Sequence, residues 1–139
     1  MPRIVLLDTG PLVALLCAQE ARHAWVVKQF SDLQPPLVTC EAVLAEADHL
    51  VRRARRQAGV VSELVHRGVL RIGLDLETEA GAISRIQAKY RDRPASLADA
   101  CLVRMTELHH GSIVMTLDED FRVYRSHGRR MIPLLMPEG

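Results

Sequence analysis

The fold of this 139-residue chain is limited most strongly by its short apolar runs. These runs show no alternation of apolar and polar positions. The clearest run is Ile-Val-Leu-Leu at residues 4–7. A strand that is buried on both faces has this pattern, and such strands are typical of parallel sheets. We predict further strands at residues 37–39, 69–72, 113–116 and 131–134, with helical segments between them.

The segments between these strands carry the periodicity and the end signals of helices. Helices are predicted at residues 12–18, 21–33, 41–56, 77–90 and 96–109, with one more helical stretch after residue 59 and a short one from residue 121. Alternating strands and helices predict an α/β fold with a mainly parallel sheet and helices on both faces. The length fits one domain, so we expect a single domain over residues 1–139.

The composition is that of an ordinary globular protein. Apolar residues make up 48% and charged residues 25% of the chain, which excludes a disordered chain. The formal net charge is +1, so contact with a nucleic acid would need a local basic patch. No apolar run approaches the roughly 18 residues of a membrane span. Asp8 and Pro11 interrupt the apolar N-terminal stretch, so we expect no export signal.

The cysteines give an expectation about the cellular compartment. Cys17, Cys40 and Cys101 are odd in number and form no Cys-x-x-Cys pair. This pattern favours a reducing, cytoplasmic location in which the thiols are small buried side chains. The histidines show no ligand spacing alongside the cysteines, so we expect no structural zinc site.

Two carboxylates follow two of the predicted strands. Asp8 ends the first run, and Asp118 stands just after the run at residues 113–116. In open α/β sheets, ligands bind outside the carboxyl ends of the strands. The sequence therefore predicts that Asp8 and Asp118 lie at a common site.

Two further carboxylates stand in helical segments that are otherwise apolar at those points. Glu46 falls at the margin of an apolar stripe, and Asp99 is the only charge in residues 97–103. Four carboxylates at one site would repel one another, and their pKa values would rise. A hard divalent cation with oxygen ligands, such as Mg²⁺, removes this repulsion and suits phosphate substrates.

Each of these acids also has a purely structural explanation. Asp8 and Asp118 have the position of helix N-caps. Ser96 and Asp99 have the spacing of a capping box. Glu46 has the spacing for an ion pair with His49. These alternatives stay open for each residue alone, but they explain the four together less well.

Four segments resemble, in order, the motifs of the PIN-domain family. They are residues 7–12 (Leu-Asp-Thr-Gly-Pro-Leu), 39–46, which end at Glu46, 97–100 (Leu-Ala-Asp-Ala) and 116–121 (Thr-Leu-Asp-Glu-Asp-Phe). The resemblance implies an α/β/α sandwich around a parallel sheet. It also implies Asp8, Glu46, Asp99 and Asp118 as metal-binding catalytic acids.

The resemblance carries expectations about activity and partners. It implies an endoribonuclease that uses Mg²⁺ or Mn²⁺ to activate water and cleave single-stranded RNA. Thr9 and Thr116 are expected to orient a carboxylate or a water molecule. A chain of this size most resembles the toxins of VapBC-type toxin–antitoxin pairs, so we expect a homodimer that binds a small antitoxin, with an antitoxin arginine among the acids.

Two further assignments concern residues beside these motifs. We prefer Asp118 to Asp120 as the fourth acid. Asp118 is two positions after Thr116, so both side chains would point to the same side if the strand geometry continues, and Asp118 lies nearer the strand end. Asp120 is then the expected N-cap of the helix from residue 121. The arginines of residues 52–56 could hold RNA phosphates, but we favour an interaction with the helix dipole. The aromatic residues are few and scattered, which favours the core or a dimer surface over base stacking.

Other classes of protein fit less well. A phospho-accepting receiver needs adjacent acids after its first strand, but Leu7 precedes Asp8, and it needs a late lysine, although none follows Lys89. A phosphatase with an Asp-x-Asp motif is excluded by Gly10. A free-standing PIN ribonuclease of RNA processing or decay remains an alternative, as does a non-catalytic module that binds RNA or protein.

Overall fold

A five-stranded parallel sheet forms the centre of the protein. The computed structural model describes residues 3–55, 57–93 and 95–138. The strands are β1 (Val5–Leu7), β2 (Leu37–Thr39), β3 (Leu70–Ile72), β4 (Ile113–Met115) and β7 (Leu134–Leu135). They lie in the order β3-β2-β1-β4-β7, and each pairs in parallel with its neighbour. The predicted mainly parallel sheet is confirmed.

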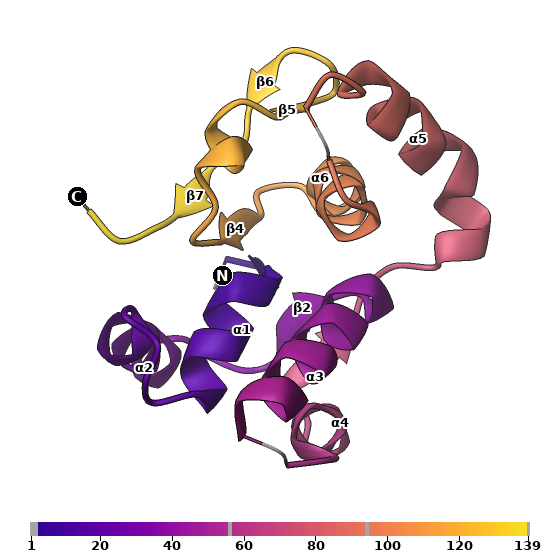
Figure 1. Cartoon of the computed structure of the whole chain (residues 1–139). Helices are drawn as coiled ribbons and strands as arrows, with labels where there is room; N and C mark the ends of the chain where they lie inside the picture. Colours follow the sequence, from indigo (N-terminus) through magenta and orange to yellow (C-terminus); the bar gives the residue numbers. More distant parts are fainter. Residues whose placement is uncertain (1–2, 56, 94, 139) are drawn as a thin grey trace.

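Helices cover both faces of this sheet. On one face lie α1 (Thr9–Leu16), α2 (His23–Asp32), α3 (Glu41–Arg55) and α4 (Val60–His66). On the other face α6 (Leu97–Leu108) packs on the sheet, and α5 (Leu76–Lys89) packs on α6 (Figure 1). The expected α/β/α sandwich is therefore present. None of the described helices is both long enough and apolar enough to cross a membrane.

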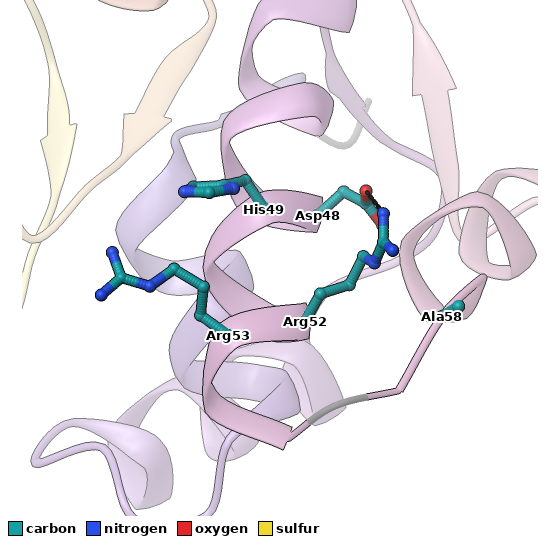
Figure 2. Close-up of a pocket in the computed structure, with 5 residues that line it drawn as sticks. All are labelled: Asp48, His49, Arg52, Arg53 and Ala58. Carbon is teal, nitrogen blue, oxygen red and sulfur yellow. Dashed lines mark ion pairs between the residues drawn. The ribbon is translucent and has the colours of Figure 1, made fainter.

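The arginines at the end of α3 do not share one role. Arg52 forms an ion pair with Asp48, with 3.9 Å between Nη1 and Oδ2 (Figure 2). Arg55 donates a hydrogen bond to the backbone carbonyl of Leu16 at the end of α1. Position 56 lies outside the described residues. The basic last turn of α3 fits the expected dipole interaction, but Arg52 and Arg55 also have specific partners.

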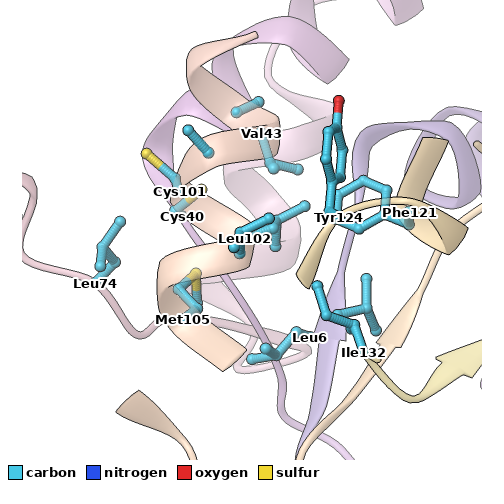
Figure 3. Packing of buried hydrophobic residues seen from close by; sticks show 14 of the residues in the cluster. Leu6, Cys40, Val43, Leu74, Cys101, Leu102, Met105, Phe121, Tyr124 and Ile132 are labelled. Carbon is cyan, nitrogen blue, oxygen red and sulfur yellow. The ribbon is translucent and has the colours of Figure 1, made fainter. Parts of the chain in front are cut away.

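Side chains of β1 alternate between two apolar clusters, which explains the lack of alternation in its sequence. Leu6 packs into the cluster that contains Leu102 and Met105 of α6 (Figure 3). Val5 and Leu7 pack on the opposite face, against α1 and α3. Since both faces of the strand are covered by helices, every position of β1 is apolar. All three cysteines are buried, as expected, and none forms a disulfide.

Helix α1 begins three residues earlier than predicted. Asp8 is its N-cap, and the Asp8 carboxylate accepts a hydrogen bond from the backbone N–H of Thr9. Pro11 therefore lies in the first turn, where a missing N–H breaks no helical hydrogen bond. The predicted turn at residues 9–11 is instead helical.

The predicted last strand at residues 131–134 is wrong. Strand β5 (Arg125–Ser126) pairs with β6 (Arg130–Met131) as an antiparallel hairpin, and β7 follows as a separate strand beside β4. His127 and Gly128 have φ values of 51° and 78° in the hairpin loop. Pro133 has no N–H for a ladder and separates β6 from β7.

Candidate active site

The crevice that the topology predicts for a ligand lies between β1 and β4. The chain runs from β1 to β2 and β3 on one side, and it returns to β4 and β7 on the other side of β1. This reversal of strand order opens a crevice at the carboxyl ends of β1 and β4. Asp8 directly follows β1, and Thr116 directly follows β4.

A cleft of about 360 Å³ occupies this position. Five of the six predicted site residues line it: Asp8, Thr9, Glu46, Asp99 and Asp118. The sixth, Thr116, is fully buried and is hydrogen-bonded to Asp8. The structure thus brings together residues that are up to 110 positions apart in the sequence.

Asp8 is the most enclosed of the four acids. Its side chain is buried, with a relative exposure of 5%. Thr9 donates its backbone N–H to Oδ1 over 2.8 Å, and Thr116 donates its hydroxyl to Oδ2 over 2.6 Å. Burial nevertheless raises the pKa of Asp8 from 3.8 to about 6, with smaller contributions from the charges of Asp99 and Asp118. The carboxylate is therefore held in place but is poorly neutralised.

Asp99 has a tyrosine as its partner. The hydroxyl of Tyr124 donates a hydrogen bond to Asp99 Oδ2 over 3.0 Å. The ring of Tyr124 is buried and contacts Phe121 edge to face (Figure 3). It also contacts the ring of Tyr90 edge to face. Burial raises the pKa of Asp99, the Tyr124 bond opposes this shift, and Asp118 adds to it. Burial and the Asp99 charge raise the pKa of Tyr124, so its hydroxyl keeps its proton near neutral pH.

Asp118 and Asp120 occupy different environments. Asp118 is the N-cap of the 3₁₀ helix η1 (Glu119–Arg122), and its Oδ1 accepts the backbone N–H of Asp120 over 2.9 Å. Asp120 lies inside η1 and forms an ion pair of 2.8 Å with Arg93. The expectation that Asp120 caps this helix is wrong, because the helix begins at Glu119. Of the two acids, Asp118 lines the cleft.

Glu46 reaches the cleft from α3 and is solvent-exposed. The alternative ion pair with His49 is not formed, and Glu46 has no hydrogen-bond or ion-pair partner within the described ranges. Leu50 of α3 is 37% exposed and also lines the cleft. The buried stripe consists of Val43, Ala47 and Val51.

The donor set fits a hydrated divalent cation. Across residues 3–55, 57–93 and 95–138, no three Asp, Glu, His or Cys side chains converge closely enough to hold a metal ion as they stand. Mg²⁺, however, keeps several waters and usually takes only one or two carboxylates. The buried hydroxyl of Thr9 has no hydrogen-bond partner, although such groups are nearly always paired. A water of a hydrated ion in the cleft would supply one.

Two residues at the site were not found from the sequence. Glu20 lines the cleft from the turn after α1, and nothing in its sequence context distinguishes it from a surface acid. Tyr124 was assigned to the core or a dimer surface, and its contact with Asp99 was missed. One signal was available, because a buried tyrosine hydroxyl requires a hydrogen-bond partner.

The comparison with known families agrees with this geometry. The sequence model of the PIN domain matches residues 5–126, which is most of the chain and includes every residue of the predicted site. The chain belongs to the PIN-domain family.

Relatives of this PIN domain include characterised bacterial proteins. Ribonuclease VapC26 of Mycobacterium tuberculosis (strain H37Rv) is 31% identical over 119 residues, which are 82% of this chain and 86% of that protein. The crystal structure of M. tuberculosis VapC20, described as a sarcin-ricin loop cleaving toxin, matches with a TM-score of 0.75. That match has 21% identity and covers 93% of this chain and 99% of the other, so it shows the shared PIN fold.

Proposed function

We propose that this PIN domain is a metal-dependent endoribonuclease that cleaves single-stranded RNA. The observation that carries the proposal is the meeting of Asp8, Asp99 and Asp118 in one cleft, where burial and mutual repulsion raise the pKa values of Asp8 and Asp99. The described residues that line this cleft carry no positive charge. Oxygen donors of this kind match Mg²⁺ and Mn²⁺.

The four acids, with Glu46 as the least constrained member, would hold the ion. When bound, a divalent ion activates water for attack on a phosphodiester and stabilises the leaving oxygen. Asp8 is fixed by the Thr9 N–H and the Thr116 hydroxyl, so its carboxylate cannot rotate freely. Asp118 is fixed in the same manner by the N–H of Asp120. Glu46 has no such bond to a described residue and sits on the open side of the cleft.

The biological role follows from the relatives. The likeness to VapC26, a ribonuclease, and to VapC20, a toxin, supports RNA as substrate and a role as the toxin of a toxin–antitoxin pair. In this proposal the chain acts in the cytoplasm as one nuclease domain over residues 1–139. It forms a homodimer and is inhibited by a small antitoxin that places an arginine among the acids.

The direct test is cleavage of a single-stranded RNA by the purified protein. We expect cleavage in the presence of Mg²⁺ or Mn²⁺. Cleavage should be lost in EDTA and should return when excess Mn²⁺ is added. Millimolar Mg²⁺ should also raise Tm, because an ion that binds only the folded state stabilises it. Full activity in EDTA would contradict the proposal, as would RNA binding without any cleavage, which would favour a non-catalytic module.

The toxin role has its own test in cells. Expression of the wild-type chain should arrest growth of a bacterial host, whereas Asp99→Asn at the same protein level should not. Growth that is unaffected by either protein, together with normal RNA cleavage in vitro, would instead favour a ribonuclease of RNA processing or decay.

Tyr124→Phe is expected to weaken metal-dependent activity without unfolding the protein. The substitution keeps the ring contacts with Phe121 and Tyr90 and removes only the hydroxyl that orients Asp99. Outer-sphere partners of metal ligands contribute about 10–100-fold to affinity or activity, so we expect the Mg²⁺ concentration for half-maximal cleavage to rise about tenfold.

Tyr90→Phe is the matched control for this effect. The Tyr90 oxygen accepts the backbone N–H of Arg125 over 2.8 Å and touches none of the acids. Tyr90→Phe should lower the free energy of unfolding by about 1 kcal/mol and leave the Mg²⁺ requirement unchanged. If both variants shift the Mg²⁺ requirement equally, Tyr124 has no specific role in positioning Asp99.

A further inference from the structure

Arg53 differs from the other arginines at the end of α3. Arg52 is paired with Asp48, and Arg55 is bound to the carbonyl of Leu16. Arg53 is exposed and makes no hydrogen bond or ion pair with any described residue. Its guanidinium is therefore available to an external ligand.

Arg53 projects from the same side of α3 as the acid cleft. At about 100° per residue, Glu46, Leu50 and Arg53 fall within one narrow sector of the helix. Glu46 and Leu50 line the acid cleft. Figure 2 shows Arg53 and His49 extending to one side of α3, while the Asp48–Arg52 pair lies on another side. Arg53 thus continues the line of the cleft along the helix.

A surface hollow of about 640 Å³ lies beside these residues, lined by Asp48, His49, Arg52, Arg53 and Ala58 (Figure 2). The Asp48 charge in it is already compensated by Arg52. Arg53 follows Glu46 by seven positions, which is about 10 Å along the helix axis. A phosphate bound by Arg53 would therefore be a different one from the phosphate held at the acids.

The cleft itself repels RNA, so its binding energy needs a source nearby. Carboxylates line the cleft, and the net charge of the chain is only +1. A guanidinium can bind a phosphate through two parallel hydrogen bonds. We propose that Arg53, assisted by a hydrogen bond from His49, binds a backbone phosphate of the RNA strand that enters the cleft along α3. This inference rests on the proposed function, since it names a substrate contact of the same site.

The test compares two exposed arginines that carry the same charge, Arg53 on α3 and Arg85 on α5. A labelled single-stranded RNA is titrated with the full-length protein in EDTA at several salt concentrations, and binding is followed by fluorescence anisotropy. Arg53→Ala should weaken binding about five- to tenfold and reduce the slope of log K against log salt concentration by about 0.7, the contribution of one single-strand phosphate contact. Arg85→Ala removes an exposed charge from α5, on the other face of the sheet, and should change affinity by less than about twofold and leave the slope unchanged.

Cleavage kinetics provide the second readout. Because the contact is remote from the reacting atoms, Arg53→Ala should raise KM while kcat stays near the wild-type value. Equal losses of affinity in Arg85→Ala and Arg53→Ala would overturn the assignment and indicate general charge attraction. Unchanged binding in Arg53→Ala, or no measurable binding by the wild type, would also overturn it.

Two outcomes separate this inference from its alternatives. The same anisotropy titration with poly-glutamate tests for a protein partner. If poly-glutamate binding depends on Arg53 but RNA binding does not, Arg53 and His49 form a contact for an acidic protein, and the RNA assignment fails. If wild-type protein binds RNA in an Arg53-dependent manner but never cleaves it with any divalent metal, the phosphate contact stands and the nuclease proposal alone fails.

Discussion

Asp8→Asn is expected to abolish RNA cleavage and, at the same time, to stabilise the metal-free protein. Loss of an outer-sphere partner of a metal ligand already costs about 10–100-fold, so loss of a ligand itself should cost more than about a hundredfold in kcat/KM. Most substitutions of a buried, doubly hydrogen-bonded residue destabilise a fold. Opposite changes in activity and stability therefore distinguish a functional carboxylate from a structural helix cap.

The expected gain in stability follows from the raised pKa of Asp8. Its ordinary pKa is 3.8, and in the fold it is about 6, so the folded state favours the protonated form. The folded state then binds more protons than the unfolded state between these pH values, and stability falls as pH rises through this window. Above about pH 6 the ionised Asp8 costs roughly 3 kcal/mol, and below about pH 4 the cost is absent.

The asparagine side chain of the Asp8→Asn variant would carry no charge. Its amide has only one oxygen, so one of the two hydrogen bonds that the Asp8 carboxylate accepts would become weaker. A poorer hydrogen bond costs about 1 kcal/mol, which leaves a net gain of about 2 kcal/mol at pH 7.5, or roughly 5 °C in Tm. The gain should fall as the pH is lowered and become a loss of about 1 kcal/mol below about pH 4, where Asp8 of the wild type is protonated and only the poorer hydrogen bond remains. Thermal unfolding in EDTA across this pH range measures it.

Asp32→Asn controls for the loss of one negative charge. Asp32 is an exposed partner of Lys28 on α2, so its replacement should change Tm little at any pH. Addition of Mg²⁺ should raise the Tm of the wild type and of Asp32→Asn but not that of Asp8→Asn. If Asp8→Asn is destabilised at pH 7.5, its cap hydrogen bonds outweigh its charge, and the acid is a structural cap.

The parts of the fold that the sequence predicted are those controlled by local patterns. The apolar run at residues 4–7 predicted a strand buried on both faces, and it could do so because helices cover both faces of β1. Asp8 and Asp118 were placed correctly at the cleft because strand ends in a parallel sheet share one edge. The helix that carries Asp99 was predicted to open at Ser96, and Ser96 is its N-cap, with its side chain accepting the N–H of Asp99.

The remaining features depend on contacts between distant segments. Tyr124 reaches Asp99 only because β5, which follows it in the chain, packs beside α6. The separate roles of Arg52 and Arg53 depend on which side of α3 faces the cleft, and a run of arginines does not contain this information. The capping and functional explanations of Asp8 and Asp118 were treated as alternatives, but both acids cap a helix and face the cleft at once.

Asp118→Asn is expected to abolish cleavage, whereas Asp120→Asn is expected to leave it nearly unchanged. Asp118 lines the cleft, and its charge raises the pKa values of Asp8 and Asp99. Asp118→Asn should therefore reduce cleavage more than about a hundredfold, yet leave the metal-free protein as stable as the wild type or more so. Asparagine is itself a good N-cap, so the hydrogen bond from the N–H of Asp120 can persist.

Asp120→Asn removes an ion pair with Arg93 in which both side chains are about two-fifths exposed. Such pairs contribute about 0–1 kcal/mol, so this variant should keep most of its activity and nearly all of its stability.

Asp118→Ala is the stricter test of the cap, because alanine removes the hydrogen bond to η1 and should cost about 1 kcal/mol relative to Asp118→Asn. Cleavage rates and Tm values of the three variants decide the assignment. An inactive Asp120→Asn beside a fully active Asp118→Asn would transfer the fourth acid to Asp120, and the Arg93 pair would then have to open for the metal to bind.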